Sequence, residues 1–405
     1  MKLIKRKDYL EEITDVINTP DIKIVTGVRR SGKSKLLEEI IKYIKLEDKN
    51  ANIIHINFNL TKYEDLQDYH KLEDTIESKF HNNVNNYIFI DEVQMCKDFE
   101  KAINSLHAKE KFDIYISGSN AFLQSSDLAT LFVGRAYEIH VFPFSFNEYS
   151  TYFPNENNYQ NLTNYMTDGG MSGSYLYKNK SRRMKYLNEE VLNALIIRDI
   201  VNKYRIRNEQ LLNLLVDYLM DNIGNLTSLR KIQNTLASNG IKADHKTIGK
   251  YIDYLCKAFA FYKVRRYDIR GKKYLNKEEK YYLSDHSFKY ARLGTRNLDY
   301  GRILENIIAV ELLRRNYEVY VGKLYKTEVD FVAIKQNQKL YIQVSNDISD
   351  EKTLNRELKP LLNIKDGYKK ILIARIYQPK YEIDGIEIID PSEWLLNLGS
   401  KKTLQ

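Results

Sequence analysis

Short apolar runs alternate with amphipathic stretches along the first 150 residues. The apolar runs are rich in β-branched and aromatic residues, which is typical of buried strands. We predict strands at residues 22–25, 52–58, 87–90, 112–120 and 136–141. Helical spacing of apolar residues predicts a helix at 9–17, ending before Pro20, a helix from residue 35, and another that ends at Phe80. This alternation predicts an α/β fold with a parallel sheet.

The pattern changes near residue 165, where helices replace the alternation. Helical periodicity predicts helices at 187–203, 210–220, 228–237 and 246–259. Two strands follow, at 261–267 and 280–283, joined by the basic turn 270–273. Helices followed by a two-stranded basic ribbon predict a winged helix, in which the helix that begins at His245 is the one that enters a DNA groove.

Alternating elements return from about residue 301 onwards. The predicted order is a helix at 303–313, strands at 319–321, 328–334 and 339–345, a helix at 350–362 and a strand at 370–374. This order predicts a second α/β domain at the end of the chain.

Length and composition set the broad class of protein. A chain of 405 residues exceeds one typical hydrophobic core, so we expect two or three domains. No apolar run approaches the roughly 18 residues that span a bilayer, so we expect no membrane partner. Residues 1–7 are basic but lack the apolar core of a signal peptide, which favours a cytoplasmic protein. Cys96 and Cys256 have no metal-ligand spacing and are expected to be reduced thiols.

One motif gives the first α/β region its chemistry. Residues 27–34, GVRRSGKS, fit G-x-x-x-x-G-K-[ST] between a predicted strand and a predicted helix. Such a loop presents backbone N–H groups and a helix N-terminus to a polyphosphate, while Lys33 reaches the β- and γ-phosphates and Ser34 ligates Mg²⁺. The nucleotide-binding residues we predict here are Gly27, Arg29, Arg30, Ser31, Gly32, Lys33, Ser34 and Lys35. The alternative is a glycine turn that binds nothing.

Two carboxylates follow the predicted strand at 87–90. We expect Asp91 to lie beside Mg²⁺, directly or through water, and Glu92 to polarise the water that attacks the γ-phosphate. With the phosphate loop upstream, this pair predicts an ATPase that uses ATP and Mg²⁺. Asn120 or Ser119, at the end of the next strand, is expected to sense the γ-phosphate. The alternative for this strand end is a simple polar turn.

The series GxRRxGKS, FIDEVQ, SGSN, GR and PFSFNEY resembles that of a family of bacterial and archaeal AAA-type ATPases. Members of that family carry a C-terminal domain similar to restriction-endonuclease-like folds. The resemblance implies an AAA-type P-loop core and an arginine finger at Arg135, which would act in trans and require a homo-oligomer. A surface or structural arginine is the alternative. Arg198 is a candidate for a second phosphate sensor on a helical lid.

Positive charge is concentrated in residues 181–280. This segment holds 21 Lys and Arg against 11 Asp and Glu, whereas the whole chain has a net charge of +9, so the rest of the chain is close to neutral. A basic module is typical of a polyanionic partner such as DNA, and a solvated lysine-rich face is the alternative. The predicted DNA contacts are Lys246, Lys250, Arg265, Arg266, Lys272 and Lys273. Winged helices of this kind also serve as structural lids or bind proteins.

The resemblance implies a second metal site in the last domain. Active restriction-endonuclease-like domains hold Mg²⁺ with an acidic residue on the first helix, an Asp on one strand and a Glu-x-Lys on the next. Glu305 and Asp330 match the first two positions, but Gln343-Val344-Ser345 stands where Glu-x-Lys is expected. A neutral amide weakens a magnesium site, so we weigh a working nuclease against a degenerate binding domain.

These inferences predict a protein of four parts. They are an AAA-type core at 1–155, a helical lid or connector at 156–208, a winged helix at 209–295 and a restriction-endonuclease-like domain at 296–405. The expected function is an Mg-dependent ATPase that couples ATP binding and hydrolysis to action on DNA. The leading alternative is an ATP-controlled switch that binds a protein partner without DNA. A protein-remodelling machine would need a pore motif, and we see no clear one.

Overall fold

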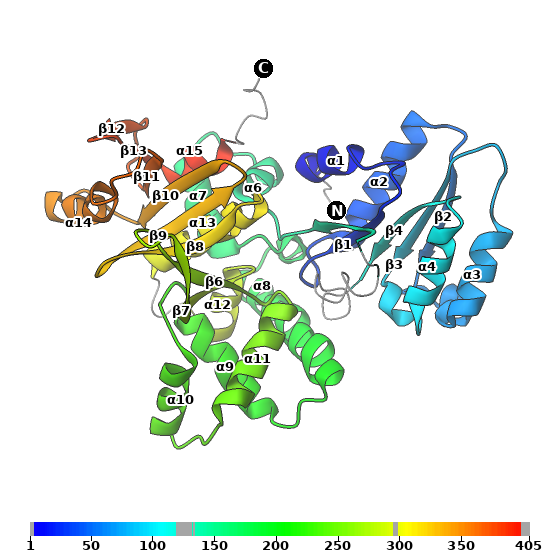
Figure 1. Cartoon of the computed structure of the whole chain (residues 1–405), viewed down its shortest axis with the longest axis horizontal. Coiled ribbons are helices and arrows are strands. Elements are labelled where there is room, and N and C mark those ends of the chain that lie inside the picture. The colour runs from blue at the N-terminus through cyan, green and yellow to red at the C-terminus, as the bar shows by residue number, and fades with distance from the viewer. Residues whose placement is uncertain (1–3, 119–131, 133, 295–298, 398–405) are drawn as a thin grey trace. The chain divides into compact units, whose positions relative to one another are not determined.

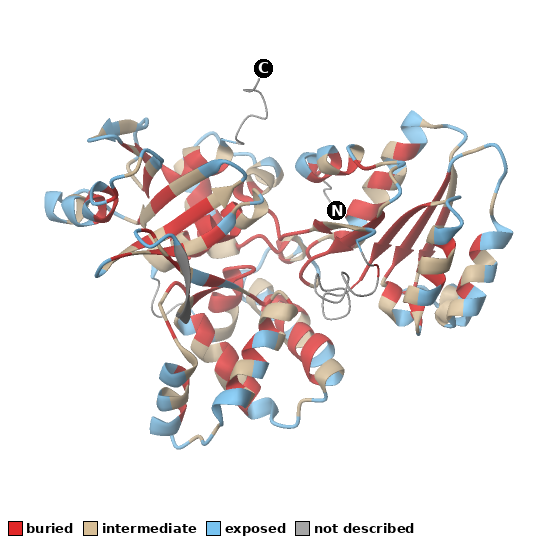
Figure 2. Ribbon diagram, viewed as in Figure 1, coloured by how far each residue is buried: buried red, intermediate tan, exposed pale blue. Residues whose placement is uncertain are grey.

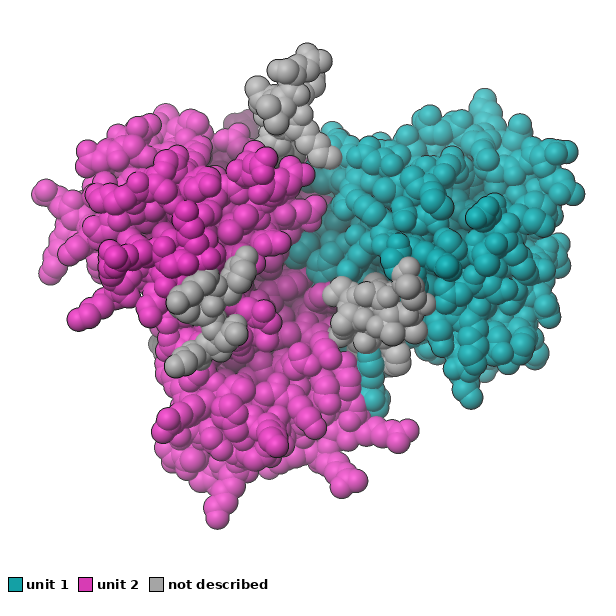
Figure 3. Space-filling view, in the orientation of Figure 1, with its two compact units in different colours: residues 1–143, 197–203 teal, residues 144–196, 204–405 magenta. Residues whose placement is uncertain are grey.

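A computed structural model of the chain describes residues 4–118, 132, 134–294 and 299–397, with only the backbone at 273–277. The chain forms two compact units (Figures 1 and 3). Unit 1 comprises residues 1–143 and 197–203, and unit 2 comprises residues 144–196 and 204–405. No helix within the described residues has both the length and the apolar character needed to cross a lipid bilayer.

A five-stranded sheet forms the centre of unit 1 in the part of the chain that is described, in the order β2-β3-β4-β1-β5. All neighbouring strands are parallel. The strands are β1 (Ile22–Thr26), β2 (Asn52–Asn57), β3 (Asn86–Asp91), β4 (Asp113–Ser117) and β5 (Ala136–His140). The α/β fold with a parallel sheet is therefore confirmed, and β1, β3 and β4 are buried along their whole length.

Helices cover both faces of this sheet. They are α1 (Lys7–Thr14), α2 (Lys33–Glu47), α3 (Tyr69–Ser78) and α4 (Phe99–Ala108), with 3₁₀ helices at Thr61–Gln67 and Val93–Met95. Strand side chains alternate between two cores: Ile24 packs with residues of α3 and α4, and Val25 packs with residues of α1 and α2. Burial on both faces explains why the strands read as continuous apolar runs (Figure 2).

One lysine interrupts the apolar interior of the sheet. Lys23 lies in the middle of β1 and is completely buried. Its ammonium lies 2.5 Å from a carboxylate oxygen of Asp113 in β4 and donates to the carbonyl of Thr19 at 2.7 Å. A buried charge is tolerated because it is paired and hydrogen-bonded.

The second segment of unit 1, residues 197–203, is part of a helix with unusually wide turns. The predicted helix at 187–203 consists largely of two π-helical stretches, Tyr186–Leu192 and Leu195–Asn202. Ile200 and Val201 are buried. Wide π-turns are rare and often accompany functional sites.

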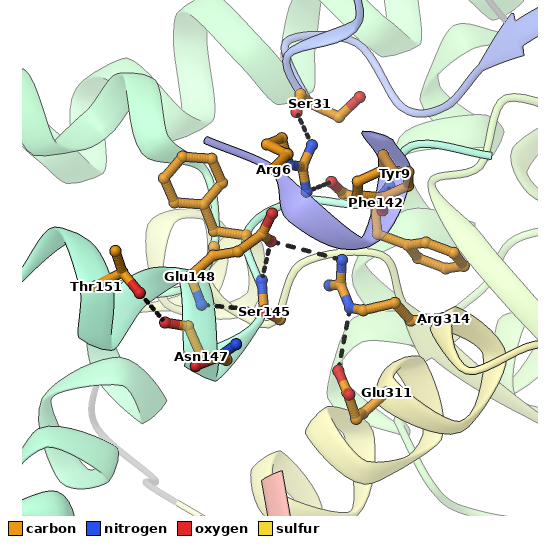
Figure 4. Close-up of polar contacts among 12 residues, drawn as sticks. Arg6, Tyr9, Ser31, Phe142, Ser145, Asn147, Glu148, Thr151, Glu311 and Arg314 are labelled. Carbon is orange, nitrogen blue, oxygen red and sulfur yellow. Dashed lines mark hydrogen bonds and ion pairs between the residues drawn. The ribbon is translucent and has the colours of Figure 1, made fainter. Parts of the chain in front are cut away.

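Unit 2 begins at Phe144, the second residue of the motif PFSFNEY, which forms the start of a helix. Ser145 precedes α6 (Phe146–Tyr152) and accepts from the backbone of Glu148, whose carboxylate accepts from the Ser145 backbone at 2.8 Å. This capping box satisfies two N–H groups at the helix end. Glu148 also lies 3.8 Å from Arg314, which pairs with Glu311 (Figure 4). The motif therefore fixes the beginning of α6 within unit 2.

The glycine-rich turn at 169–170 is a place of close packing. It follows α7 (Asn158–Asp168), and Gly169 has φ of 73°. A Cβ atom at Gly169 would lie 2.3 Å from a carboxylate oxygen of Asp285, and the Gly170 N–H donates to that carboxylate at 2.7 Å. Glycine is needed here so that two backbone segments of unit 2 can approach.

Helices and a short ribbon follow the turn. The helices are α8 (Lys180–Lys185), α9 (Glu209–Asp221), α10 (Leu229–Ser238), α11 (His245–Lys257) and α12 (Ser287–Leu293). The ribbon consists of β6 (Phe261–Asp268) and β7 (Lys273–Leu283), paired antiparallel, and Thr227 forms a β-bridge to Glu279 of β7. Three helices and a two-stranded ribbon thus lie in the predicted order between residues 209 and 283.

The ribbon is part of a larger sheet. In the described residues this sheet has eight strands in the order β12-β13-β11-β10-β9-β8-β6-β7. Its further strands are β8 (Glu318–Leu324), β9 (Thr327–Lys335), β10 (Gln338–Ser345), β11 (Lys369–Ala374), β12 (Tyr381–Ile383) and β13 (Ile386–Ile389). The accompanying helices are α13 (Tyr300–Arg314), α14 (Glu351–Leu362) and α15 (Pro391–Leu396). Because β6 pairs in parallel with β8, the ribbon extends the sheet of the last domain.

Candidate nucleotide-binding site

The phosphate loop joins β1 to α2 through two glycines with positive φ. Gly27 has φ of 139° and Gly32, the residue before α2, has φ of 104°. A Cβ atom at Gly27 would lie 2.1 Å from the carbonyl oxygen of Val141, so no other residue fits there without a shift of the backbone. The N-cap residue of α2 is Gly32, and within the described residues no side-chain cap bonds this helix end. Its first N–H groups are therefore suited to bind an anion.

Arg6 holds this loop from the side of the N-terminal helix. Its buried guanidinium donates to the carbonyl oxygens of Ser31 at 3.1 Å and Phe142 at 2.9 Å, and it lies 4.5 Å from the ring of Tyr9 (Figure 4). Residues far apart in the sequence are thereby tied to one loop. Arg6 was not predicted to belong to this site, because its only signal in the sequence is a position within the basic residues 1–7.

Lys33 is folded back onto its own loop. It is 6% exposed, and its ammonium donates to the carbonyl oxygens of Gly27 at 2.9 Å and Val28 at 3.2 Å. Burial lowers the pKa of Lys33, while the negative charges of Glu92 and Asp199 oppose this effect. A buried cation at this position is a strong local attractor for phosphate oxygens.

Asp91 and Glu92 lie at the end of β3, and β4 separates β3 from β1 in the sheet. Asp91 is 1% exposed and accepts a short hydrogen bond from the Ser117 hydroxyl at the end of β4. Glu92 has φ of 58°, and its carboxylate accepts from the amide of Gln94. The charges of Glu92 and Asp91 oppose the lowering of the Lys33 pKa, and the ends of β1, β4 and β3 are neighbours at one edge of the sheet.

A third acidic residue, Asp199, contacts the loop from the π-helical segment. The guanidinium of Arg29 forms two hydrogen bonds with the Asp199 carboxylate, at 2.7 and 3.1 Å. Burial alone would lower the pKa of Arg29, but the bonds and charge of Asp199 outweigh it, so this pKa is raised. The predicted sensor was the neighbouring residue Arg198, which is exposed. Periodicity placed both residues on one helix and could not show which of them faces the loop.

The remaining predicted nucleotide residues have diverse surroundings. Ser34 is half-buried, and the exposed Lys35 pairs with Glu38 at 2.7 Å. Arg30 is exposed and has φ of 64°. The hydroxyl of Ser31 is buried and has no hydrogen-bond partner among the described residues.

Two further predicted residues follow β4 in the sequence. Asn120, like Ser119, lies outside the described residues. Arg135 is exposed, and its carbonyl accepts from the N–H of Ile22 at 2.7 Å at the start of β1. Its backbone thus belongs to the sheet while its side chain points to solvent.

The structure brings the three predicted residues of the second metal site close together. Glu305 and Asp330 both pair with Lys280 of β7. The Gln343 side chain accepts from the Asp330 backbone N–H at 3.3 Å and donates to Glu357 at 3.0 Å. Within the described residues, no group of three or more His, Cys, Asp or Glu side chains is arranged to hold a metal ion.

The predicted DNA contacts are not all equally available. Lys246 and Lys250 on α11, Arg265 on β6 and Lys272 in the turn are exposed. Arg266 is half-buried and forms a short ion pair with Glu278. The side chain of Lys273 lies outside what the structure describes.

Comparison with known families divides the chain at nearly the same place as the fold. Residues 19–150 match the family model of an AAA domain, and residues 159–299 match that of a domain of unknown function. A solved structure, the Walker-type ATPase of Pyrococcus abyssi, aligns with 71% of this chain and 95% of its own at 17% identity and a TM-score of 0.46.

Two relatives extend over most of the chain. An uncharacterized protein of Methanocaldococcus jannaschii is 28% identical over 383 residues, covering 89% of this chain and 82% of the relative. An uncharacterized protein of Haemophilus influenzae is 37% identical over 401 residues, covering 97% of this chain and 99% of the relative. The chain therefore belongs to the family of this Haemophilus influenzae protein, and its residues 19–150 match the model of an AAA domain.

Proposed function

We propose that this protein binds and hydrolyses Mg-ATP and couples the nucleotide state to action on DNA by unit 2. The observation that carries the ATPase part is the meeting of the phosphate loop with the end of β3. Lys33 is buried in the loop, and the charges of Glu92 and Asp91 act on it. Phosphoryl transfer requires a cation that binds the phosphates, a carboxylate that binds the metal and a carboxylate that orients the attacking water.

The residues of the loop fit a bound nucleotide. Gly27 admits no side chain, the N-terminus of α2 has no side-chain cap, and the Ser31 hydroxyl is buried without a partner in the described structure. Each of these features suits phosphate oxygens that approach the backbone. Ser34 and Asp91 would hold Mg²⁺, which would supply positive charge to neutralise the phosphates.

Each side chain of the site then has a definite task. Lys33 exchanges the carbonyls of Gly27 and Val28 for phosphate oxygens. Glu92 accepts a hydrogen bond from the attacking water and polarises it. The hydroxyl of Ser117 holds Asp91 in one orientation. Asn120 as a γ-phosphate sensor and Arg135 as a finger in a homo-oligomer are parts of the same proposal.

The segment 197–203 gives the nucleotide a direct route to unit 2. Asp199 belongs to unit 1 and pairs with Arg29 in the loop, while the chain on both sides of the segment belongs to unit 2. A phosphate that competes for Arg29 weakens the ion pair between Arg29 and Asp199, which holds this segment against the loop. The change is then passed along the covalent chain in both directions, which is why we place the coupling here.

The DNA part of the proposal rests on charge. Residues 181–280 carry ten more positive than negative side chains, and Lys246, Lys250, Arg265 and Lys272 are exposed. Together with the order of helices and ribbon at 209–283, this supports a winged helix that contacts phosphates. The four-part division at residues 155, 208 and 295 belongs to this proposal, as does a restriction-endonuclease-like domain at 296–405.

The ATPase rate of the full-length protein, with and without duplex or single-stranded DNA at low salt, tests the proposal. We expect hydrolysis that DNA stimulates, loss of nucleotide binding in Lys33→Ala, and loss of hydrolysis with binding retained in Glu92→Gln. An unchanged rate in Glu92→Gln would sink the role of Glu92. A rate that ignores DNA would favour the alternative, a nucleotide switch for a protein partner.

A further inference from the structure

Three carboxylates of unit 2 converge on one buried ammonium. Lys280 lies in β7 and is 2% exposed. Its Nζ atom lies 2.8 Å from Glu305 in α13, and 2.7 and 3.7 Å from Glu328 and Asp330 in β9. One side chain therefore bridges acidic residues from two other elements, and it comes from the strand that precedes both in the sequence.

The acidic side chains are held by partners of their own. The Tyr282 hydroxyl donates at 2.7 Å to the same Glu305 oxygen that Lys280 contacts. The backbone N–H of Val344 donates to Asp330 at 2.9 Å. A Cβ atom at Gly224 would lie 2.9 Å from a Glu305 oxygen. The cluster is thus closely packed around the ammonium, and its carboxylates are oriented toward it.

The side chain expected to complete a magnesium site already has two hydrogen-bond partners within unit 2. The Gln343 amide donates to Glu357 at 3.0 Å, and its oxygen accepts from the Asp330 backbone at 3.3 Å. Mg²⁺ demands near-octahedral oxygen ligands at about 2.0–2.1 Å. A lysine ammonium needs only acceptors for its three N–H groups. The surroundings of Lys280 provide acceptors for an ammonium group, but they do not provide an octahedral set of oxygen ligands for Mg²⁺.

Electrostatics favour the ammonium as a permanent occupant. Burial alone would lower the pKa of Lys280, but the charges of Glu305, Asp330 and Glu328 outweigh it, so this pKa is raised. The side chain is therefore charged at neutral pH. A divalent ion entering the cluster would meet a cation already bonded to the oxygens it needs.

We propose that the Lys280 ammonium takes the place of the divalent cation in this cluster. The cluster is then an ion-pair centre that fastens β7 to α13 and β9, and it does not serve as a metal-dependent cleavage centre. A nucleic acid reaching this domain would be bound without being cut. This inference does not depend on the phosphate loop, so it stands or falls separately from the proposed ATPase.

The test counts Mn²⁺ ions bound to the full-length, nucleotide-free protein, by the electron paramagnetic resonance signal of free Mn²⁺. We expect the unaltered protein and its Glu305→Gln variant to bind the same number of ions. An ion that the unaltered protein binds and Glu305→Gln loses would overturn the proposal, because Glu305 would then serve a metal.

Lys280→Met provides the converse experiment. Removing the ammonium leaves three carboxylates together, so we expect the variant to gain one bound Mn²⁺ and to lose it again when Glu305→Gln is added. Lys263→Met, which removes an ammonium 3.7 Å from Glu279 in the same ribbon, should gain none. A folded Lys280→Met that gains no Mn²⁺ would overturn the proposal. If Lys280→Met does not fold, the Mn²⁺ counts of the unaltered protein and of Glu305→Gln decide whether the proposal holds.

Discussion

The cations of the phosphate loop already have partners within unit 1. Lys33 donates to two carbonyls of its own loop, and Arg29 is held at two points by Asp199. A polyphosphate must compete with both arrangements. Asp199 also places a negative charge near Lys33, as its effect on the pKa of that lysine indicates. At the scale of single residues, Asp199 is therefore an internal competitor of the nucleotide.

We predict that Asp199→Asn tightens ATP binding, because it removes a charge that repels phosphates and releases Arg29. A partly exposed charge pair is worth about 1 kcal/mol, so the Kd should fall about fivefold. Titration with a fluorescent ATP analogue measures this. Asp217→Asn, which removes the partner of Arg292 in unit 2 at 2.7 Å, is the matched control and should change nothing. Weaker binding in Asp199→Asn would instead mean that Asp199 positions Arg29 for the nucleotide.

His286 should make the protein less stable in acid. Burial lowers the pKa of His286, against the charges of Asp285 and Asp168 and its bond to the Tyr165 carbonyl. The unfolded chain, with a pKa of about 6.5, therefore takes up the proton first. The stability that the neutral ring contributes is present above this pH and is lost as the pH falls below it.

The measurement is the unfolding midpoint in denaturant between neutral and mildly acidic pH. His286→Gln keeps a donor for the Tyr165 carbonyl and should lose less stability on acidification than the unaltered protein. The difference should be about 1.4 kcal/mol for each pKa unit of the shift. His245→Gln, at an exposed position, serves as the control. Identical pH profiles for the unaltered protein and His286→Gln would contradict the argument.

At the scale of elements, the sequence predicts the positions of helices and strands well, but it predicts poorly which strands pair with one another. The five strands of unit 1 appear at their expected places, because buried parallel strands give unbroken apolar runs. The same pattern gave the helix, three-strand, helix, strand order of α13 to β11. The short strands β12 and β13 were not expected, since runs of three and four residues carry little periodicity.

Sequence periodicity cannot predict the contacts around Arg29 in the phosphate loop or those around Lys280 in unit 2. A motif with fixed spacing predicted Lys33, and two carboxylates directly after a predicted strand predicted the roles of Asp91 and Glu92. Asp199 is 170 residues from Arg29, and Lys280 is 25 residues from Glu305. Such pairs depend on how elements pack. The parallel pairing of β6 with β8, which joins the ribbon to the last domain, was hidden for the same reason.

The junction of β1 with the loop should not tolerate a single added methyl group. In Gly27→Ala the new Cβ atom would lie 2.1 Å from the Val141 carbonyl oxygen, and φ at this position is 139°. We expect a loss of about 1–3 kcal/mol or more of unfolding free energy, with loss of nucleotide binding. Gly367→Ala, where nothing lies within 4 Å of the added atom, is the control for thermal unfolding and ATP binding. Unchanged binding in Gly27→Ala would show that the loop can move away from Val141.

At the scale of the whole molecule, charge is distributed unevenly. The excess of positive side chains lies within residues 181–280, and the rest of the chain is close to neutral. If DNA binds through phosphates, its affinity must depend on salt, because each contact releases a counterion.

Replacing four exposed side chains by Gln should weaken this dependence. The variant carries changes at Lys246, Lys250, Arg265 and Lys272. The slope of log K against log salt for duplex DNA should fall by about 0.9 for each side chain that contacts a phosphate. A control variant removes as many exposed lysines from unit 1: Lys42, Lys45, Lys49 and Lys79. Equal slopes for the two variants would mean that DNA does not recognise the ribbon and α11.

The chain enters unit 1 a second time at residue 197 and leaves it again after 203. Residues 144–196 must therefore leave the ribosome before unit 1 has all of its parts. A gene fusion that takes only residues 1–143 carries a phosphate loop whose Arg29 has lost Asp199. The segment that completes the loop even lies within the region that matches the domain of unknown function, and not within the AAA match. A recombination event that separates residues 1–143 from residues 197–203 therefore also separates Arg29 from Asp199.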